Sequence, residues 1–164
     1  MPFHICGARG PSQEPDETLG VLKDFCEEKG CEGQIIDAEM VFGKQHIQSA
    51  YEHAKRAFDN GTNSSKSLAT EILLYASGER QIVSAIKKMG IKDGTTSFCV
   101  LLIGDAEPDG LIRRLGFKKD DSLLEGDVKN LKAFGISKKE IGTVPEDEIL
   151  DLVLERVAMV DLLK

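Results

Sequence analysis

Apolar residues at helical spacing predict two successive helices within residues 68–94. Ser77-Gly78 interrupts the apolar pattern of the first helix and is expected to end it. Gly90 follows the second helix and is expected to cap it in a left-handed conformation. The buried stripe predicted for the second helix consists of Ile82, Val83, Ala85, Ile86 and Met89, and its opposite face of Arg80, Ser84, Lys87 and Lys88. The segment is therefore predicted to be a helical hairpin with one buried face and one basic face.

The start of the last helix is predicted from a capping-box pattern. Thr143-Val144-Pro145-Glu146 places a threonine three residues before a glutamate, with proline in the first turn. From there the helix is expected to run to the C-terminal end of the sequence. Apolar side chains cover more than half of its circumference: Ile149, Leu150, Val153, Val157, Met159, Val160 and Leu163. One core contact does not require so wide a surface, so part of it is expected to meet a partner.

Further helices and four short strands complete the predicted set. The helices are expected from Ser12 or Asp16 to Gly30, over Lys44–Phe58, over Leu111–Leu115 and over Val128–Phe134. The strands are expected at Phe3–Ala8, Gln34–Asp37, Phe98–Ile103 and Ser122–Leu124. Because Phe98–Ile103 is continuously apolar, it is predicted to be the central strand, covered on both faces. The fold class is therefore mixed α/β (α+β), a single domain over residues 1–164 with a small central sheet covered by several helices.

Composition narrows the class of protein. The chain has 164 residues, of which 41% are hydrophobic and 30% charged, as in ordinary globular domains. No apolar run approaches the roughly 20 residues that span a bilayer, so no membrane role is expected. Met1–Gly7 lacks the features of a secretory signal, so we expect a cytoplasmic protein whose four cysteines are thiols.

The distribution of charge allows two interpretations. A net charge of −7 argues against a broad electrostatic grip on nucleic acid. Residues 61–92 nevertheless carry five basic and two acidic side chains, the only segment with a basic excess. This segment is either a local binding patch or simply a solvated helix face.

Candidate catalytic, cofactor and metal residues do not assemble into a recognisable set. The spacing of Cys26 and Cys31 fits neither a zinc knuckle nor a redox CxxC, so both are expected to be structural thiols. His46 and His53 lie seven residues apart, which is poor for a shared metal, and are expected to be exposed or half-buried. Glu71 lies among apolar neighbours, where a raised pKa suits an acid or base, whereas a lone glutamate on a helix more often caps the helix, pairs with a cation or faces water. An alternative function is therefore an enzyme or small-molecule sensor with Glu71 and Arg80 in a pocket between the hairpin helices.

Three segments resemble a known family, the kinase-binding small subunit of the KEOPS/EKC tRNA-modification complex, also called the PRPK-binding (TPRKB) family. The most specific is the central motif, which spans residues 70–82 (TEILLYASGERQI) and 85–91 (AIKKMGI). The Ala-Ser-Gly-Glu-Arg-Gln-Ile form is similar to that of archaeal members. The C-terminal helix, at residues 149–151, 156–158 and 161–163, also resembles the end of that family, and Gly7-Ala8-Arg9 its start.

The resemblance implies a non-catalytic subunit without a cofactor. That family docks on the small atypical kinase/ATPase subunit of KEOPS, which makes N6-threonylcarbamoyladenosine in tRNA. In archaeal relatives it also engages the tRNA 3′ CCA end. Because the last helix carries more apolar surface than one core contact needs, the kinase-docking surface is expected to include Met159, Leu162 and Leu163; the alternative is that these residues pack in the core. The tRNA-contacting face is expected to consist of Lys66, Arg80, Lys87, Lys88, Ile91 and Lys92.

Overall fold

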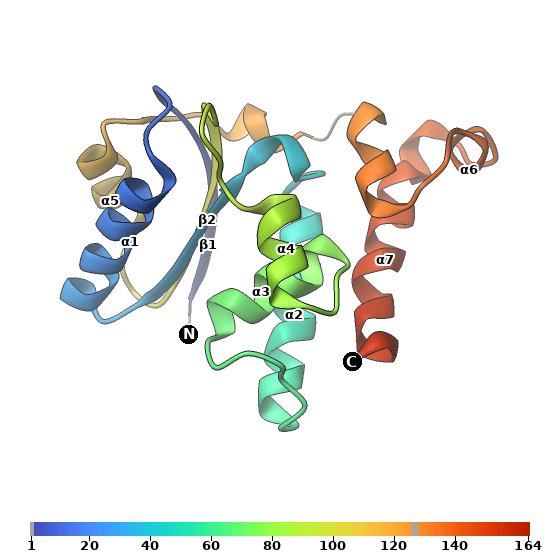
Figure 1. Ribbon diagram of the computed structural model, residues 1–164, viewed down its shortest axis with the longest axis horizontal. Coiled ribbons are helices and arrows are strands. Elements are labelled where there is room, and N and C mark those ends of the chain that lie inside the picture. The colour runs from blue at the N-terminus through green and yellow to red at the C-terminus, as the bar shows by residue number, and fades with distance from the viewer. Residues whose placement is uncertain (1, 126–127) are drawn as a thin grey trace.

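A four-stranded antiparallel sheet organises the chain in the computed structural model, which describes residues 2–125 and 128–164 (Figure 1). Its strands lie in the order β2-β3-β1-β4. Their bounds are Phe3–Arg9 for β1, Glu32–Asp37 for β2, Ser97–Ile103 for β3 and Lys118–Lys119 for β4. The predicted α+β class is confirmed.

The continuously apolar strand lies inside the sheet, as predicted. β3 pairs with β1 on one side and β2 on the other, and residues 98–103 are all buried. Because successive side chains of a strand point to opposite faces, β3 supplies both cores. Phe98, Val100 and Leu102 enter one core, and Cys99, Leu101 and Ile103 enter the other.

Helices cover both faces of this sheet (Figure 1). On one face lie α1 (Pro15–Lys29) and α5 (Pro108–Leu115). On the other face lie α2 (Lys44–Asp59), α3 (Leu68–Ser77) and α4 (Ile82–Met89), with α7 (Ile149–Leu163) packed outside α2 and α3. Short helices fill the connections: η1 Ala38–Met40, η2 Asp121–Leu124, η3 Val128–Phe134, α6 Lys138–Gly142 and η4 Glu146–Glu148.

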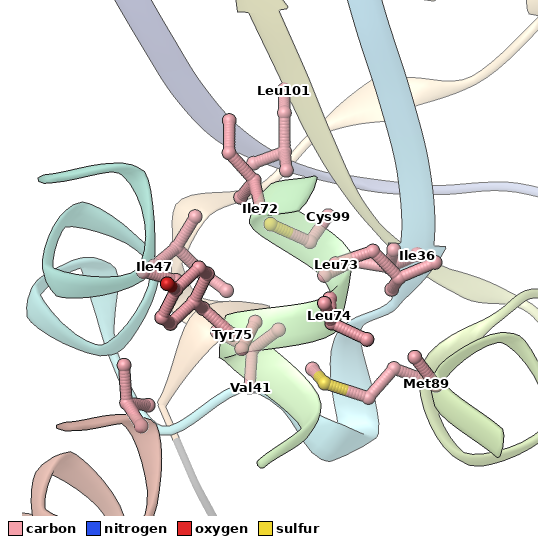
Figure 2. Close-up of a cluster of buried hydrophobic side chains, with 14 of the residues drawn as sticks. Ile36, Val41, Ile47, Ile72, Leu73, Leu74, Tyr75, Met89, Cys99 and Leu101 are labelled. Atoms are coloured by element: carbon pink, nitrogen blue, oxygen red, sulfur yellow. The ribbon is translucent and has the colours of Figure 1, made fainter. Parts of the chain in front are cut away.

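The first helix of the predicted hairpin, α3, is the centre of the larger core. Its residues from Glu71 to Ser77 are all buried. Figure 2 shows Ile72, Leu73 and Leu74 of α3 among side chains of β2, β3, α2 and α4. A helix that is apolar on every side must be enclosed by other elements. The sheet, α2, α4 and α7 provide that enclosure.

The strand predicted at Ser122–Leu124 is wrong. These residues belong to the 3-10 helix η2, and the strand lies earlier, at Lys118–Lys119. The side chain of Asp120 accepts the N–H of Ser122 at 3.1 Å. Such a side-chain bond turns the backbone and offers it an alternative to a sheet ladder.

The capping box predicted at Thr143–Glu146 is also wrong. The Thr143 hydroxyl donates to the carbonyl of Glu140 at 2.7 Å, at the end of α6. A capping box with the same residue pattern forms six residues earlier, where Ser137 and Glu140 begin α6. Helix α7 starts only at Ile149, after the 3-10 turn η4. Because the same pattern occurs twice within ten residues, the sequence alone does not show which copy begins a helix.

Gly90 is not the left-handed cap that was predicted. It is extended, with φ −67° and ψ 155°, and forms an isolated bridge with Ile36 of β2. A Cβ at Gly90 would lie 2.4 Å from the carbonyl oxygen of Ile86, so the close approach requires glycine. The left-handed residue in the hairpin is Gly78, with φ 72°, which ends α3.

His46 is fully buried, contrary to the expectation of an exposed or half-buried histidine. Its Nδ1 accepts the N–H of Phe42 at 3.1 Å, so its Nε2–H donates to the carbonyl of Ala76 at 2.8 Å. Burial lowers the pKa of His46 to about 4. A proton on Nδ1 would also remove the acceptor for Phe42, so the folded protein holds a neutral imidazole.

We expect this histidine to make stability depend on pH. Below about pH 6.5 His46 is protonated in the unfolded chain, whereas in the folded protein it stays neutral down to about pH 4. The free energy of unfolding should therefore fall as pH is lowered through this window, by at most about 3 kcal/mol. Urea denaturation of the wild type and of His46→Gln between pH 7 and pH 4.5 measures the difference. Parallel pH dependences for the two proteins would contradict the assignment.

Candidate binding surfaces

The end of α7 presents apolar side chains to solvent. Val153, Val157 and Val160 are buried and account for the core-facing side of the helix. Met159, Leu162 and Leu163 are 40%, 82% and 45% exposed. We call these three residues the α7 apolar end. The expectation that α7 carries more apolar surface than its core contact uses is confirmed.

A polar network holds the last turn of α7 against α2 and α3. The Asp161 carboxylate accepts a hydrogen bond from the Tyr75 hydroxyl of α3 and lies 2.9 Å from Nδ1 of His53 of α2. Burial opposes ionisation of Asp161, but the bonds from Tyr75 and His53 outweigh it and keep its pKa below the ordinary value. Lys164 donates to the Tyr75 hydroxyl at 3.0 Å. The network therefore fixes the direction in which the α7 apolar end points.

Glu71 of α3 is the buried anchor of the same network. Its carboxylate accepts bonds from the N–H groups of Ser64 and Ser65 at 3.0 and 2.8 Å, and from the Lys164 ammonium at 2.6 Å. Burial acts to raise the pKa of Glu71, yet these donors outweigh it and hold the pKa below its ordinary value. The raised pKa expected for a catalytic acid is therefore wrong. Arg80, its supposed partner in a pocket, is exposed.

The outer side of α4 combines apolar and basic side chains. Val83 and Ile86, predicted to be buried, are 78% and 51% exposed, and only Ala85 and Met89 of the predicted stripe are buried. Lys87 is exposed beside them, and Arg80 is exposed in the turn before the helix. We call Arg80, Val83, Ile86 and Lys87 the α4 outer face. The sequence did carry a signal for this exposed apolar surface: the predicted stripe had more apolar residues than an eight-residue helix can bury in one narrow contact.

Lys88 does not belong to this outer face, because its side chain turns inward and is only 16% exposed. Its ammonium donates to the carbonyl of Ser77 at 2.7 Å and pairs with Glu79 at 3.1 Å. It also lies 4.9 Å from the centroid of the Phe134 ring. A cation here satisfies the carbonyl of the last residue of α3, so Lys88 stabilises the hairpin.

The remaining predicted RNA residues lie in separate environments. Lys66 is exposed in the loop before α3, and Figure 1 places this loop at the opposite end of the molecule from the connection between α4 and β3. In that connection the Lys92 ammonium donates to the carbonyl of Gly90 at 3.0 Å and lines a cavity with Asp37. Ile91 is half-buried against the core under α1 and α5. The structure thus brings together Arg80 and Lys87, joined by two apolar side chains, rather than all six residues.

Metal binding, a cysteine nucleophile and membrane crossing have little support among the described residues. In residues 2–125 and 128–164, no group of three or more His, Cys, Asp and Glu side chains is placed to hold a metal. Burial and the neighbouring thiol of Cys31 raise the pKa of Cys26 to about 12, so Cys26 is a poor nucleophile. None of the described helices is long and apolar enough to cross a membrane.

Comparison with known proteins places these surfaces in context. The family model described as kinase binding protein CGI-121 matches residues 21–161. The regulatory protein Cgi121 of Methanocaldococcus jannaschii is 30% identical over 144 residues, which cover 82% of this chain and 87% of that protein.

Two fungal proteins named EKC/KEOPS complex subunits match shorter segments, each at 32% identity. The Aspergillus fumigatus protein aligns over 106 residues, 63% of this chain and 53% of its own length. The Coccidioides immitis protein aligns over 72 residues, 44% of this chain and 35% of its own length. The family model covers most of this chain, and the archaeal relative matches along most of both sequences. The resemblance noted in the sequence is therefore confirmed, and the chain belongs to the CGI-121 family of kinase binding proteins.

Proposed function

We propose that this chain is the non-catalytic subunit of a KEOPS complex that binds the small kinase/ATPase subunit and helps to recruit tRNA by its 3′ CCA end. The modification served is N6-threonylcarbamoyladenosine. The family description and the names of the fungal relatives support the kinase and the complex. The observation that carries the proposal is the α7 apolar end. Its side chains lie outside the core, and their exposure to water is unfavourable.

The α7 apolar end has the properties of a docking surface for the kinase. Its three apolar side chains lie on one turn and a half of helix, and the bonds from Asp161 and Lys164 to α3 hold that turn in place. A preorganised apolar patch loses little conformational entropy on binding. Removing a leucine side chain of this exposure from water contributes roughly 1.5–3 kcal/mol.

We expect Leu162→Ser to weaken kinase binding by about tenfold or more, because it removes the most exposed leucine of the docking surface. Isothermal titration with the purified kinase subunit measures the effect. Val83→Ser is the matched control, since Val83 is 78% exposed on α4 and should leave the affinity unchanged. Equal affinities for the wild type and Leu162→Ser would remove α7 from the interface.

Truncation after Val160 is a poorer test of the same surface. It would delete Asp161 and Lys164 together with the leucines, leaving Glu71 buried without its cation. An unpaired buried charge is strongly destabilising, so lost binding would not distinguish docking from unfolding.

The α4 outer face has the chemistry of a site for a single-stranded RNA end. Unstacked bases pack on apolar or planar side chains, while phosphates pair with lysine and arginine. Val83 and Ile86 supply the apolar part, and Arg80 and Lys87 the charge. With so few free cations on an acidic protein, the affinity should be modest and sensitive to salt.

We expect Lys87→Glu to weaken tRNA binding and to lower the log-log salt slope by roughly 0.7, as one phosphate contact is lost from a single strand. Lys23→Glu is the control with the same change in charge, because Lys23 is exposed on α1, across the sheet from α4. Fluorescence anisotropy with tRNA, with and without its CCA end, measures both variants. Identical losses for Lys23→Glu and Lys87→Glu would indicate a general charge effect and no site on α4.

A further inference from the structure

The outer edge of β1 is covered over only part of its length. β4 pairs with β1 at Ala8 and Arg9 alone. The next residue, Gly7, donates its N–H to Oδ1 of Asp121 at 2.9 Å and accepts the N–H of Asp120 at 2.8 Å. Among the described residues, the row of partners along this edge ends at Gly7.

The backbone groups of Phe3 and Ile5 face the uncovered edge. Gly104 donates its N–H to the carbonyl of Pro2 at 2.9 Å, so the even-numbered residues of β1 direct their backbone groups to β3. The odd-numbered residues direct theirs outward, as the bonds of Gly7 confirm. In the part of the chain that the structure describes, no hydrogen bond reaches the N–H or C=O of Phe3 or Ile5. Four backbone groups are thus aligned as a strand template.

This edge lies in a groove of about 570 Å³, floored by residues 3–6 of β1. The first turns of α2 and α5 form its two walls. Paired strands lie about 4.8 Å apart, so whatever pairs with β1 must fit between these helices. A second copy of this chain would bring its own α2 and α5 beside its β1 and is too wide. A single extended segment, with no flanking helices, fits the groove.

The two ends of the groove differ in charge. Lys119 lines it and lies opposite Ala8 in the sheet register, which marks the end beside Gly7. Glu107 also lines it and follows β3 by four residues, and Ile103 at the end of β3 lies opposite Phe3. Lys44 and Asp109 also line the groove, and Lys44 is paired with Asp121 at 3.0 Å, beside Gly7. With Lys44 paired, Lys119 is the lysine left to meet a partner at that end, so a complementary segment carries an acidic residue at the Lys119 end and a basic residue at the Glu107 end.

We propose that the groove binds an extended segment of a partner protein as an added edge strand. The segment spans about four residues, enough to cover β1 from Phe3 to Cys6. Its backbone pairs with Phe3 and Ile5, and its end charges set its direction. No residue of the α7 apolar end or of the α4 outer face lines the groove, so this site is separate from the kinase and tRNA surfaces.

The first experiment is selection of a random phage-displayed heptapeptide library on the full chain, followed by synthesis of the selected peptide. Bound peptide should slow amide exchange at Ile5 by about tenfold or more, while Cys6, which already faces β3, stays unchanged. N-methylation of alternate peptide residues, those facing β1, should abolish binding, and N-methylation of the intervening residues should not. Exchanging the two end charges should weaken it.

A pair of variants separates the groove from the rest of α2. Gln48→Trp places a large side chain in the groove and should lower peptide affinity by about tenfold or more. Glu52→Trp adds the same side chain one turn further along α2, outside the groove, and should leave the affinity unchanged. The proposal is overturned if no library peptide binds, if bound peptide leaves Ile5 exchange unaltered, or if it tolerates Gln48→Trp. Sedimentation showing a dimer with Ile5 protected would assign the edge to a second copy instead.

Discussion

The buried carboxylate of Glu71 in α3 is the constraint on which the helical side of the molecule depends. A charge at this depth is tolerated only with its donors in place, and removing one partner of such a pair costs about 3–5 kcal/mol. The donors come from two segments: the backbone of Ser64 and Ser65, just before α3, and the Lys164 ammonium, 93 residues after Glu71 in the chain. Satisfying one side chain therefore fixes both the loop before α3 and the end of α7.

This arrangement lets α7 serve two purposes at once. Its valines complete the core around α3, and its polar groups, Asp161 and Lys164, meet Tyr75 and Glu71 at the far end. The apolar side chains of the same turns are then left to face solvent in a defined direction. A comparable division occurs on α4, where Lys88 closes the end of α3 while Lys87 and two apolar neighbours point outward. The α7 apolar end and the α4 outer face thus lie on helices whose inward side chains bond to α3.

The sheet contributes a different kind of surface. Helices cover both of its faces, so only an edge of the sheet is left to bind a partner. At an edge, pairing is made by backbone N–H and C=O groups and not by side chains. The short β4 and the Asp120–Asp121 turn cover one half of the β1 edge and leave the other half lined by α2 and α5. Kinase docking, RNA contact and strand addition would then use three separate parts of the molecule.

Hydrophobic pattern alone determined the fold class, the central strand Phe98–Ile103, the principal helices and the apolar excess of α7, because periodicity and composition report directly on burial. Tertiary contacts decided three features that the hydrophobic pattern does not determine: where a helix starts, which lysine is exposed and whether Glu71 is ionised. A capping motif that occurs twice, at Ser137 and Thr143, acts only where the neighbouring chain permits a helix start. Lys87 and Lys88 are adjacent lysines, yet Lys88 turns inward to the carbonyl of Ser77 and the Phe134 ring, whereas Lys87 stays exposed. The state of Glu71 depends on donors up to 93 residues away, and such long-range pairing lies beyond any local pattern.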